Sequence, residues 1–157
     1  MDTNARRVIS VIVVNESSVL SRITDLFSAR GYNITSLTVA PIPETKYSRL
    51  TIVTSGSVRV IEQITKQLHK LIPVLRVYEH EDLVEKEMAM VKFPASENIA
   101  DISTLCEAYN GKIVNVSENM IIVMIADEPK RVENYLKLIK RYNPKEIVVG
   151  GAVALER

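Results

Sequence analysis

The 157-residue chain is 46% hydrophobic and 25% charged, an ordinary globular composition. Its 20 Lys and Arg against 19 Asp and Glu leave a net charge of +1, which gives no electrostatic basis for binding nucleic acid or an acidic membrane surface. The single cysteine, Cys106, cannot form an internal disulfide, and no apolar run approaches the roughly 18 residues that a membrane span needs. We therefore expect a soluble, cytoplasmic protein of one medium or two small domains.

The segment from Val8 to Ile34 is predicted to form a strand, a helix and the start of a second strand. Its β-branched apolar run breaks at Asn15–Ser18, and apolar residues then recur at helical spacing. Ser17 is the predicted N-cap, because its hydroxyl can accept a hydrogen bond from a first-turn amide, and Gly31 is predicted to end the helix in the left-handed conformation. The predicted apolar stripe of this helix comprises Val19, Leu20, Ile23, Leu26 and Phe27.

The remainder of the first half is predicted to form two strands, a helix and a closing strand. The two strands, 33–40 and 47–54, flank a loop with two prolines, and the closing strand spans 74–78. The resulting order is βαββαβ, a ferredoxin-like unit over residues 1–79. The next segment, 80–87, is strongly charged with few apolar residues, and it is predicted to be a linker whose end can join the following strand.

The second half, residues 88–157, is predicted to repeat the same order of elements. Asn98 is expected to precede its first helix and Pro129 to begin its second, and a short tail is expected from Gly150. The expected fold class is therefore α+β, with two ferredoxin-like βαββαβ domains in tandem. Each half is small, so burial of its sheet against another subunit would add stability, and we expect a dimer. The predicted strands of this half are 88–93, 112–116, 120–126 and 147–149.

The corner at Asn15–Leu20 is the predicted functional centre. The first amides of a helix have no intrahelical partner and the helix dipole favours an anion, so a small carboxylate is expected to bind there. Asn15 and Asn33 both offer an amide with donor and acceptor ends, and Leu20 and Ile34 supply apolar surface for an aliphatic side chain. The spacing is also compatible with a plain strand-to-helix loop, and it leaves open whether these residues meet within one chain or across a dimer.

The sequence contains no recognisable catalytic or metal-binding constellation. His69 and His80 are predicted to be solvated, and neither has cysteine or histidine neighbours at zinc spacing. Cys106 lies on an apolar helical stripe and is predicted to belong to the core. RNA-recognition modules share the ferredoxin-like order, but the strand at Val8–Val14 has no aromatic residue on which a base would stack. An enzyme, an RNA-binding regulator and a metal-responsive regulator are therefore disfavoured alternatives.

Several short motifs spread over the chain carry a family resemblance. In the first half they are Val14-Asn15-Glu16-Ser17, Leu20-Ser21-Arg22, Arg30-Gly31-Tyr32-Asn33-Ile34, Ser36-Leu37-Thr38-Val39, Ser48-Arg49-Leu50-Thr51-Ile52, Lys66-Gln67-Leu68-His69-Lys70-Leu71 and Val74-Leu75-Arg76-Val77. In the second half they are Glu85-Lys86-Glu87-Met88, Met90-Val91-Lys92 and Gly111-Lys112-Ile113. Together they resemble the small regulatory subunit of acetolactate (acetohydroxyacid) synthase. The likeness covers nearly the whole chain, is dense up to about Val77 and is looser beyond Gly111.

The resemblance implies an ACT domain in the first half, with the effector lying between two ACT domains of a dimer. Residues matching Asn15, Ser18 and Leu20 face the effector from one chain, and residues matching Asn33 and Ile34 face it from the other. Where this chain has Ser18 the family usually has glycine, and the added side chain either crowds the effector or gives it a further hydrogen bond. The expected effector site comprises Asn15, Glu16, Ser17, Ser18, Val19, Leu20, Asn33 and Ile34.

The resemblance also implies a role and a partner. A chain of this family is not catalytic by itself; it raises the activity of the catalytic large subunit and confers feedback inhibition by valine or a related branched-chain amino acid. No cofactor is expected on this chain, whereas thiamine diphosphate, Mg and FAD are expected on the large subunit. Neither nucleic acid nor membrane is an expected partner. A stand-alone ACT-type amino-acid sensor is the alternative function.

Overall fold

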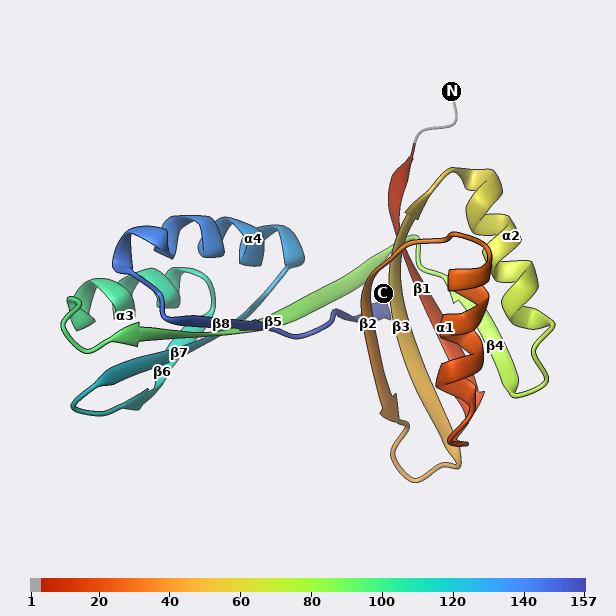
Figure 1. Ribbon diagram of the computed structural model, residues 1–157, viewed down its shortest axis with the longest axis horizontal. Coiled ribbons are helices and arrows are strands. Elements are labelled where there is room, and N and C mark those ends of the chain that lie inside the picture. Colours follow the sequence, from red (N-terminus) through yellow and green to blue (C-terminus); the bar gives the residue numbers. More distant parts are fainter. Residues whose placement is uncertain (1–3) are drawn as a thin grey trace. The chain divides into compact units, whose positions relative to one another are not determined.

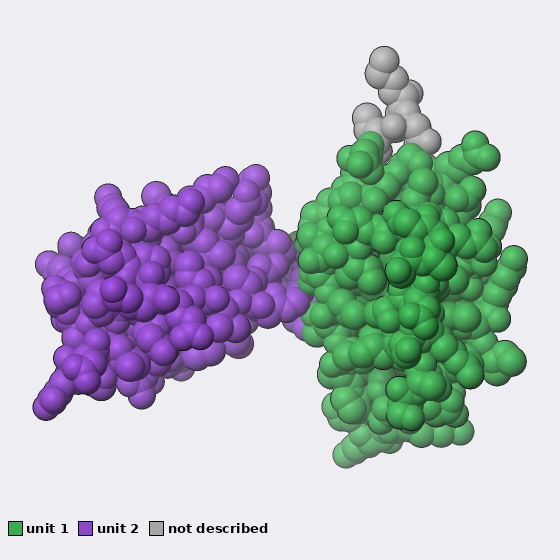
Figure 2. Space-filling view, in the orientation of Figure 1, with its two compact units in different colours: residues 1–84, 154–157 green, residues 85–153 purple. Residues whose placement is uncertain are grey.

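The computed structural model describes residues 4–157, and the chain divides into two compact units (Figures 1 and 2). The first unit contains the residues up to 84 together with 154–157, and the second contains 85–153. Residues 1–3 of the predicted first domain lie outside the described part. Within residues 4–157, no helix has the length and apolar character needed to cross a membrane.

The first unit has the predicted βαββαβ order. Its strands form one antiparallel sheet in the order β2-β3-β1-β4, so β2 and β4 are its two edges, and its two helices cover one face (Figure 1). Its elements are β1 (Ala5–Val14), α1 (Val19–Ala29), β2 (Ile34–Pro41), β3 (Tyr47–Gly56), α2 (Val58–His69) and β4 (Val74–Glu79). The sequence periodicity therefore predicted every element of this unit.

Strand β1 is buried on both of its faces. Ile9, Val11 and Val13 belong to the core beneath the two helices, and the intervening residues, Ser10 among them, are buried on the opposite face. The helices complete this core with one apolar residue from each successive turn, for example Val19, Ile23 and Phe27 of α1. Burial of both faces explains why this strand has a nearly continuous apolar sequence.

The second unit also has the predicted order, with both helices on one face of its sheet (Figure 1). The strand order is β6-β7-β5-β8, and a further strand, β9, pairs with β5. The elements are β5 (Leu83–Pro94), α3 (Ile99–Ala108), β6 (Gly111–Val116), β7 (Met120–Asp127), α4 (Pro129–Leu138), the 3-10 helix η1 (Ile139–Tyr142) and β8 (Glu146–Val149). Strand β9 (Val153–Glu156) belongs to the first unit from residue 154 onward.

Local signals in the sequence explain the helix ends of the second unit. The Asn98 side chain accepts hydrogen bonds from the amides of Ala100 and Asp101, 3.0 and 3.2 Å away, and so caps α3. Asn110 has a φ of 58°, the left-handed conformation that reverses the chain into β6. Pro129 occupies the start of α4, where its missing N–H removes no helix hydrogen bond.

Two expectations for the chain between and after the units require correction. The segment predicted as a linker is only partly irregular, because β5 begins at Leu83 and its alternating side chains extend the sheet pattern through the charged residues. The expected tail after Gly150 contains β9, and residues 154–157 cluster with the first unit. Four residues flanked by glycines and the terminus carry too short an alternation for a sequence pattern to indicate a strand.

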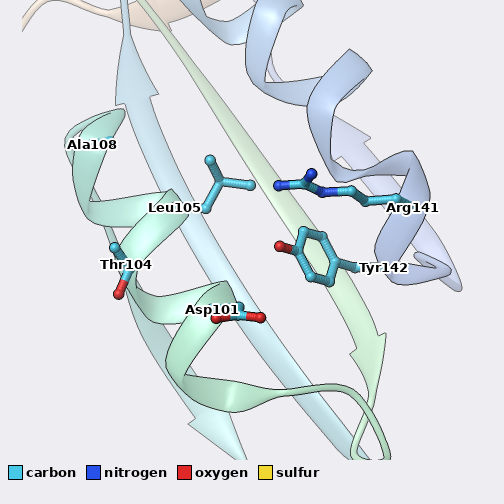
Figure 3. A pocket seen from close by; sticks show the side chains of 6 residues that line it. All are labelled: Asp101, Thr104, Leu105, Ala108, Arg141 and Tyr142. Carbon is cyan, nitrogen blue, oxygen red and sulfur yellow. The ribbon is translucent and has the colours of Figure 1, made fainter.

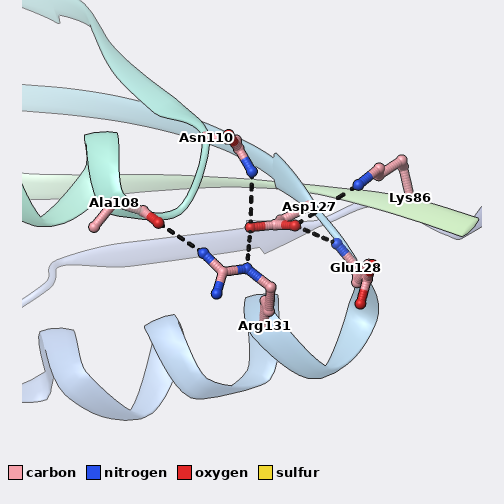
Figure 4. A network of polar contacts seen from close by, with 6 residues as sticks. All are labelled: Lys86, Ala108, Asn110, Asp127, Glu128 and Arg131. Atoms are coloured by element: carbon pink, nitrogen blue, oxygen red, sulfur yellow. Dashed lines mark hydrogen bonds and ion pairs between the residues drawn. The ribbon is translucent and has the colours of Figure 1, made fainter.

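A buried carboxylate joins three segments of the second unit (Figure 4). Asp127, 2% exposed at the end of β7, accepts hydrogen bonds from Arg131 Nε at 2.6 Å, from the Glu128 amide at 2.8 Å and from Asn110 Nδ2 at 3.1 Å. Burial raises the pKa of Asp127, but the bonds from Arg131 and the Glu128 amide outweigh it and hold that pKa below its usual value. Lys86 adds a weaker ion pair at 3.8 Å. This network fixes the start of α4 against the turn into β6.

Asp127→Asn is expected to lower the free energy of unfolding by about 1–3 kcal/mol at pH 7, because it removes a charge-assisted acceptor from a buried network. A carboxylate with a depressed pKa stabilises the fold above its unfolded-state pKa of about 4 and loses that contribution as pH falls through its folded-state pKa. The difference between wild type and variant should therefore shrink below about pH 4. Urea unfolding at pH 7 and below about pH 4 measures the difference in unfolding free energy between wild type and Asp127→Asn. Glu118→Gln, at an exposed position, is the control. Equal stability of Asp127→Asn and wild type at pH 7 would contradict the assignment.

Candidate functional site

Three loops meet at one end of the first unit, around the corner that follows β1. The backbone amide of Asn15 donates to the carbonyl of Lys46 at 2.9 Å, which joins the corner to the β2–β3 loop. The Val14 amide donates to the carbonyl of Pro73 at 3.0 Å, which joins it to the α2–β4 turn. Residues 15–18 are all exposed. The corner is therefore accessible to a ligand and is anchored on both sides by backbone hydrogen bonds.

The helix α1 begins at this corner without a side-chain cap. Ser18, not the predicted Ser17, is the N-cap residue, and its φ of −92° and ψ of −8° are already helical, so its hydroxyl does not reach a first-turn amide. The Arg22 amide donates to the Ser18 carbonyl at 3.1 Å, which sets the start of the helix one residue later than predicted. The first turn also contains no acidic residue. The positive end of this helix is consequently left to a solvent molecule or an anionic ligand.

Apolar residues beside the corner differ in accessibility. Val19, the first residue of α1, is 3% exposed and belongs to the core, so it supports the corner from beneath. Leu20 is 38% exposed. Of these two predicted site residues, only Leu20 therefore offers a surface to an aliphatic ligand.

The predicted partner residues Asn33 and Ile34 lie at the other end of α1. Gly31, at a φ of 68°, ends this helix as predicted, and the chain then enters β2. The Thr54 hydroxyl donates to the Asn33 carbonyl, which fixes Asn33 beside the end of β3. Ile34 packs partly against the core and Asn33 is exposed.

The length of strand β3 gives the distance between Asn15 and Asn33, the two predicted halves of the site. Asn15 contacts Lys46 before the start of β3, whereas Asn33 contacts Thr54 near its end. Eight residues of extended chain span roughly 26 Å at about 3.3 Å per residue. A single copy of the chain therefore does not bring Asn15 and Asn33 together, a point that the sequence left open.

A buried polar cluster in the first unit was missed at the level of sequence. His80, predicted to be solvated, is 7% exposed; its Nε2 lies 2.5 Å from Ser10 Oγ and its Nδ1 lies 3.5 Å from a Glu156 carboxylate oxygen. The Tyr78 ring packs edge-on against it at 5.0 Å. Ser10 is fully buried, so no substrate reaches its hydroxyl, and the cluster joins β1 to the C-terminal strand. The polar Ser10 within the otherwise apolar run Val8–Val14 was the available signal.

The second unit offers little that resembles a reactive site. Cys106 is fully buried, as predicted, and burial raises the pKa of its thiol, so it is a core residue. A shallow cavity of about 300 Å³ lies between α3 and η1 (Figure 3), with Asp101, Thr104, Leu105, Ala108, Arg141 and Tyr142 along its walls. Among the residues that the structure describes, no group of three or more His, Cys, Asp or Glu side chains is placed to hold a metal ion.

The structure defines a class of protein with two tandem ferredoxin-like units, the first with an uncapped, accessible helix start after its opening strand. Comparison with known proteins supports this class. Residues 9–76 match the model of the AHAS small subunit-like ACT domain, and residues 86–157 match the model of the small subunit of acetolactate synthase. The chain belongs to the acetolactate synthase small-subunit family.

Individual relatives match the sequence of this chain over nearly their whole length. The chain is 42% identical to the acetolactate synthase isozyme 3 small subunit of Escherichia coli, covering 97% of this chain and 96% of that protein. It is 36% identical to the acetolactate synthase small subunit of Bacillus subtilis, covering 97% and 91%. The crystal structure of the Thermotoga maritima small subunit superposes with a TM-score of 0.91 at 34% identity, covering 98% of both chains. These relatives are named as the small subunit, not the catalytic one.

Proposed function

We propose that this chain activates the catalytic large subunit of acetolactate synthase and makes it sensitive to valine. The observation that carries the proposal is the uncapped start of α1 beside Asn15, in a chain of the small-subunit family. Effector binding and dimerisation are assigned to the first unit, which contains both Asn15 and the edge strand β2. The chain supplies no cofactor; thiamine diphosphate, Mg and FAD belong to the large subunit, and the complex works in the cytoplasm.

The chemistry of the corner matches an aliphatic zwitterion. The Val19 amide donates to the Glu16 carbonyl at 3.3 Å, so the next amides of the first turn, those of Leu20 and Ser21, together with the helix dipole, favour the carboxylate of valine. The Asn15 side-chain amide offers its oxygen to the ammonium group of valine. The exposed side of Leu20 suits the isopropyl group. Asn33 and Ile34 complete the enclosure from a second copy, because the same chain holds its own pair roughly 26 Å away.

The edge strand β2 explains how a second copy supplies those residues. Its sequence, ITSLTVAP, contains no charged residue, although charges are the usual protection of an exposed strand edge. Antiparallel pairing of two β2 strands sets Ile34 of one copy beside Pro41 of the other. Pro41 pairs with Ser48, at the end of the sheet where Asn15 lies. The two-fold axis of such a dimer therefore creates two equivalent sites.

Ser18 lies at the N-cap, next to the proposed carboxylate position. Its hydroxyl makes no cap hydrogen bond and Ser18 is exposed, so it is available to donate to the bound carboxylate. In this proposal the serine adds a contact to valine and does not block the site.

Activation of the cognate catalytic subunit tests the proposal. Adding the chain should raise acetolactate production several-fold, and valine should then lower it toward the rate of the catalytic subunit alone. Production that stays unchanged when the chain is added would contradict the regulatory role. Valine binding without any activation would favour the stand-alone sensor, and a salt-dependent shift of RNA would favour the RNA-binding alternative.

A further inference from the structure

The turn between α2 and β4 presents one apolar side chain to solvent. Ile72 is 95% exposed, the highest exposure among the large hydrophobic residues of the described chain. Its neighbours are held inward: Pro73 is buried, and Leu71 and Val74 pack against the core. The amide of Val74 donates to the Leu71 carbonyl at 3.0 Å, which closes the turn around Ile72. The exposure of Ile72 is therefore imposed by an anchored turn.

This turn is attached directly to the effector corner. The Pro73 carbonyl accepts the amide hydrogen of Val14 at 3.0 Å, and Asn15 is the next residue. Leu75, three residues beyond Ile72, is also 58% exposed. A movement of the corner on effector binding would thus reach Ile72 through one backbone hydrogen bond.

The sequence segment that contains Ile72 is basic. The sixteen residues from Gln63 to Tyr78 contain no Asp or Glu but include Lys66, Lys70 and Arg76. None of these three cations forms an ion pair with a residue that the structure describes. The local excess of positive charge contrasts with the net charge of +1 for the whole chain. Lys70 lies two residues before Ile72, and Lys66 and Arg76 lie on the adjoining helix α2 and strand β4. Cations that flank an exposed apolar side chain complement an apolar pocket with an acidic rim.

We propose that Ile72 is the anchor by which this chain docks on the catalytic large subunit, inserting into an apolar pocket bordered by carboxylates. This inference rests on the proposed function, since it concerns the surface used for that activation. A second copy of the chain is not the occupant, because the proposed dimer uses β2, and β4 lies at the opposite edge of the sheet. The position of the anchor beside Asn15 also explains how valine weakens activation: the bound corner shifts the turn.

The test measures activation of the cognate catalytic subunit by the full chain carrying Ile72→Asp. The concentration for half-maximal activation is expected to rise at least about tenfold, as for an interface hot spot. Ile72→Leu should stay within about twofold of wild type. Val58→Asp is the matched control, because Val58 is 53% exposed at the opposite end of α2. Thermal unfolding and valine titration of the isolated variants should match wild type, since an exposed side chain is changed.

Charge reversal provides a second variant. Lys66→Glu combined with Lys70→Glu should raise the half-maximal concentration and reduce its dependence on salt. Activation by Ile72→Asp at the wild-type concentration would overturn the inference, as would an equal loss in Val58→Asp. A wild-type chain that does not activate at all contradicts the proposed function itself, a result distinct from wild-type activation that is indifferent to Ile72.

Discussion

Asn15→Ala is expected to weaken valine binding by about 10- to 100-fold, the cost of losing a hydrogen bond to a charged ligand group in a desolvated site. Asn15 is exposed, and the contact that fixes its position is made by its backbone amide to Lys46, so the substitution leaves the corner itself intact. Titration calorimetry of the purified chain measures the loss, with unchanged thermal unfolding as the check on folding.

Asn119→Ala is the matched control for this experiment. Asn119 is exposed in the turn between β6 and β7 of the second unit. Its backbone amide donates to the Ser117 hydroxyl at 3.3 Å, a contact that substitution of the side chain leaves in place. The control should bind valine as wild type does. Equal valine binding by Asn15→Ala and wild type would remove the corner from the effector site.

Val39→Asp is expected to convert the dimer into monomers and to abolish valine binding with it. Val39 is 44% exposed on the edge strand β2, and antiparallel pairing of two β2 strands would bring two aspartates to the same interface. A rise of at least about 100-fold in the dimer dissociation constant is expected from the like charges and the lost apolar contact. Light scattering over a dilution series measures it.

Loss of binding in this variant follows from geometry alone, because the substitution leaves all the proposed ligand contacts in place. Val58→Asp, on α2, introduces the same charge away from β2 and should leave both the dimer and valine binding unchanged. Val39→Asp that stays dimeric, or that binds valine as a monomer, would contradict a site shared between two copies.

The sequence predicted the architecture because its periodic signals are strong. Alternation along β3 and the helical stripe of α2 place both elements, and Gly31 and Asn98 mark helix ends by simple local chemistry. The structure adds a feature that periodicity cannot predict, the exact first residue of α1. Ser18 replaces Ser17 as the cap because the exact first turn depends on competing backbone hydrogen bonds.

The candidate site was predictable in its parts but not in its geometry. Asn15 and Asn33 were both recognisable as amides beside helix α1, yet only the register of β3 shows that one chain keeps them far apart. His80 illustrates the same limit: its charged neighbours in sequence indicated solvent, but long-range packing against Ser10 and Glu156 buries it. Burial decided by residues some 70 positions away leaves no local signature.

Mixing two defective chains tests most directly whether one effector site is built from two copies. Asn15→Ala and Asn33→Ala homodimers each carry two damaged sites, whereas a mixed dimer has one site with both asparagines intact. After subunit exchange in equal amounts, valine should titrate tightly to about a quarter of the wild-type number of sites, since half the dimers are mixed and each has one intact site. No tight binding after confirmed exchange would contradict the account.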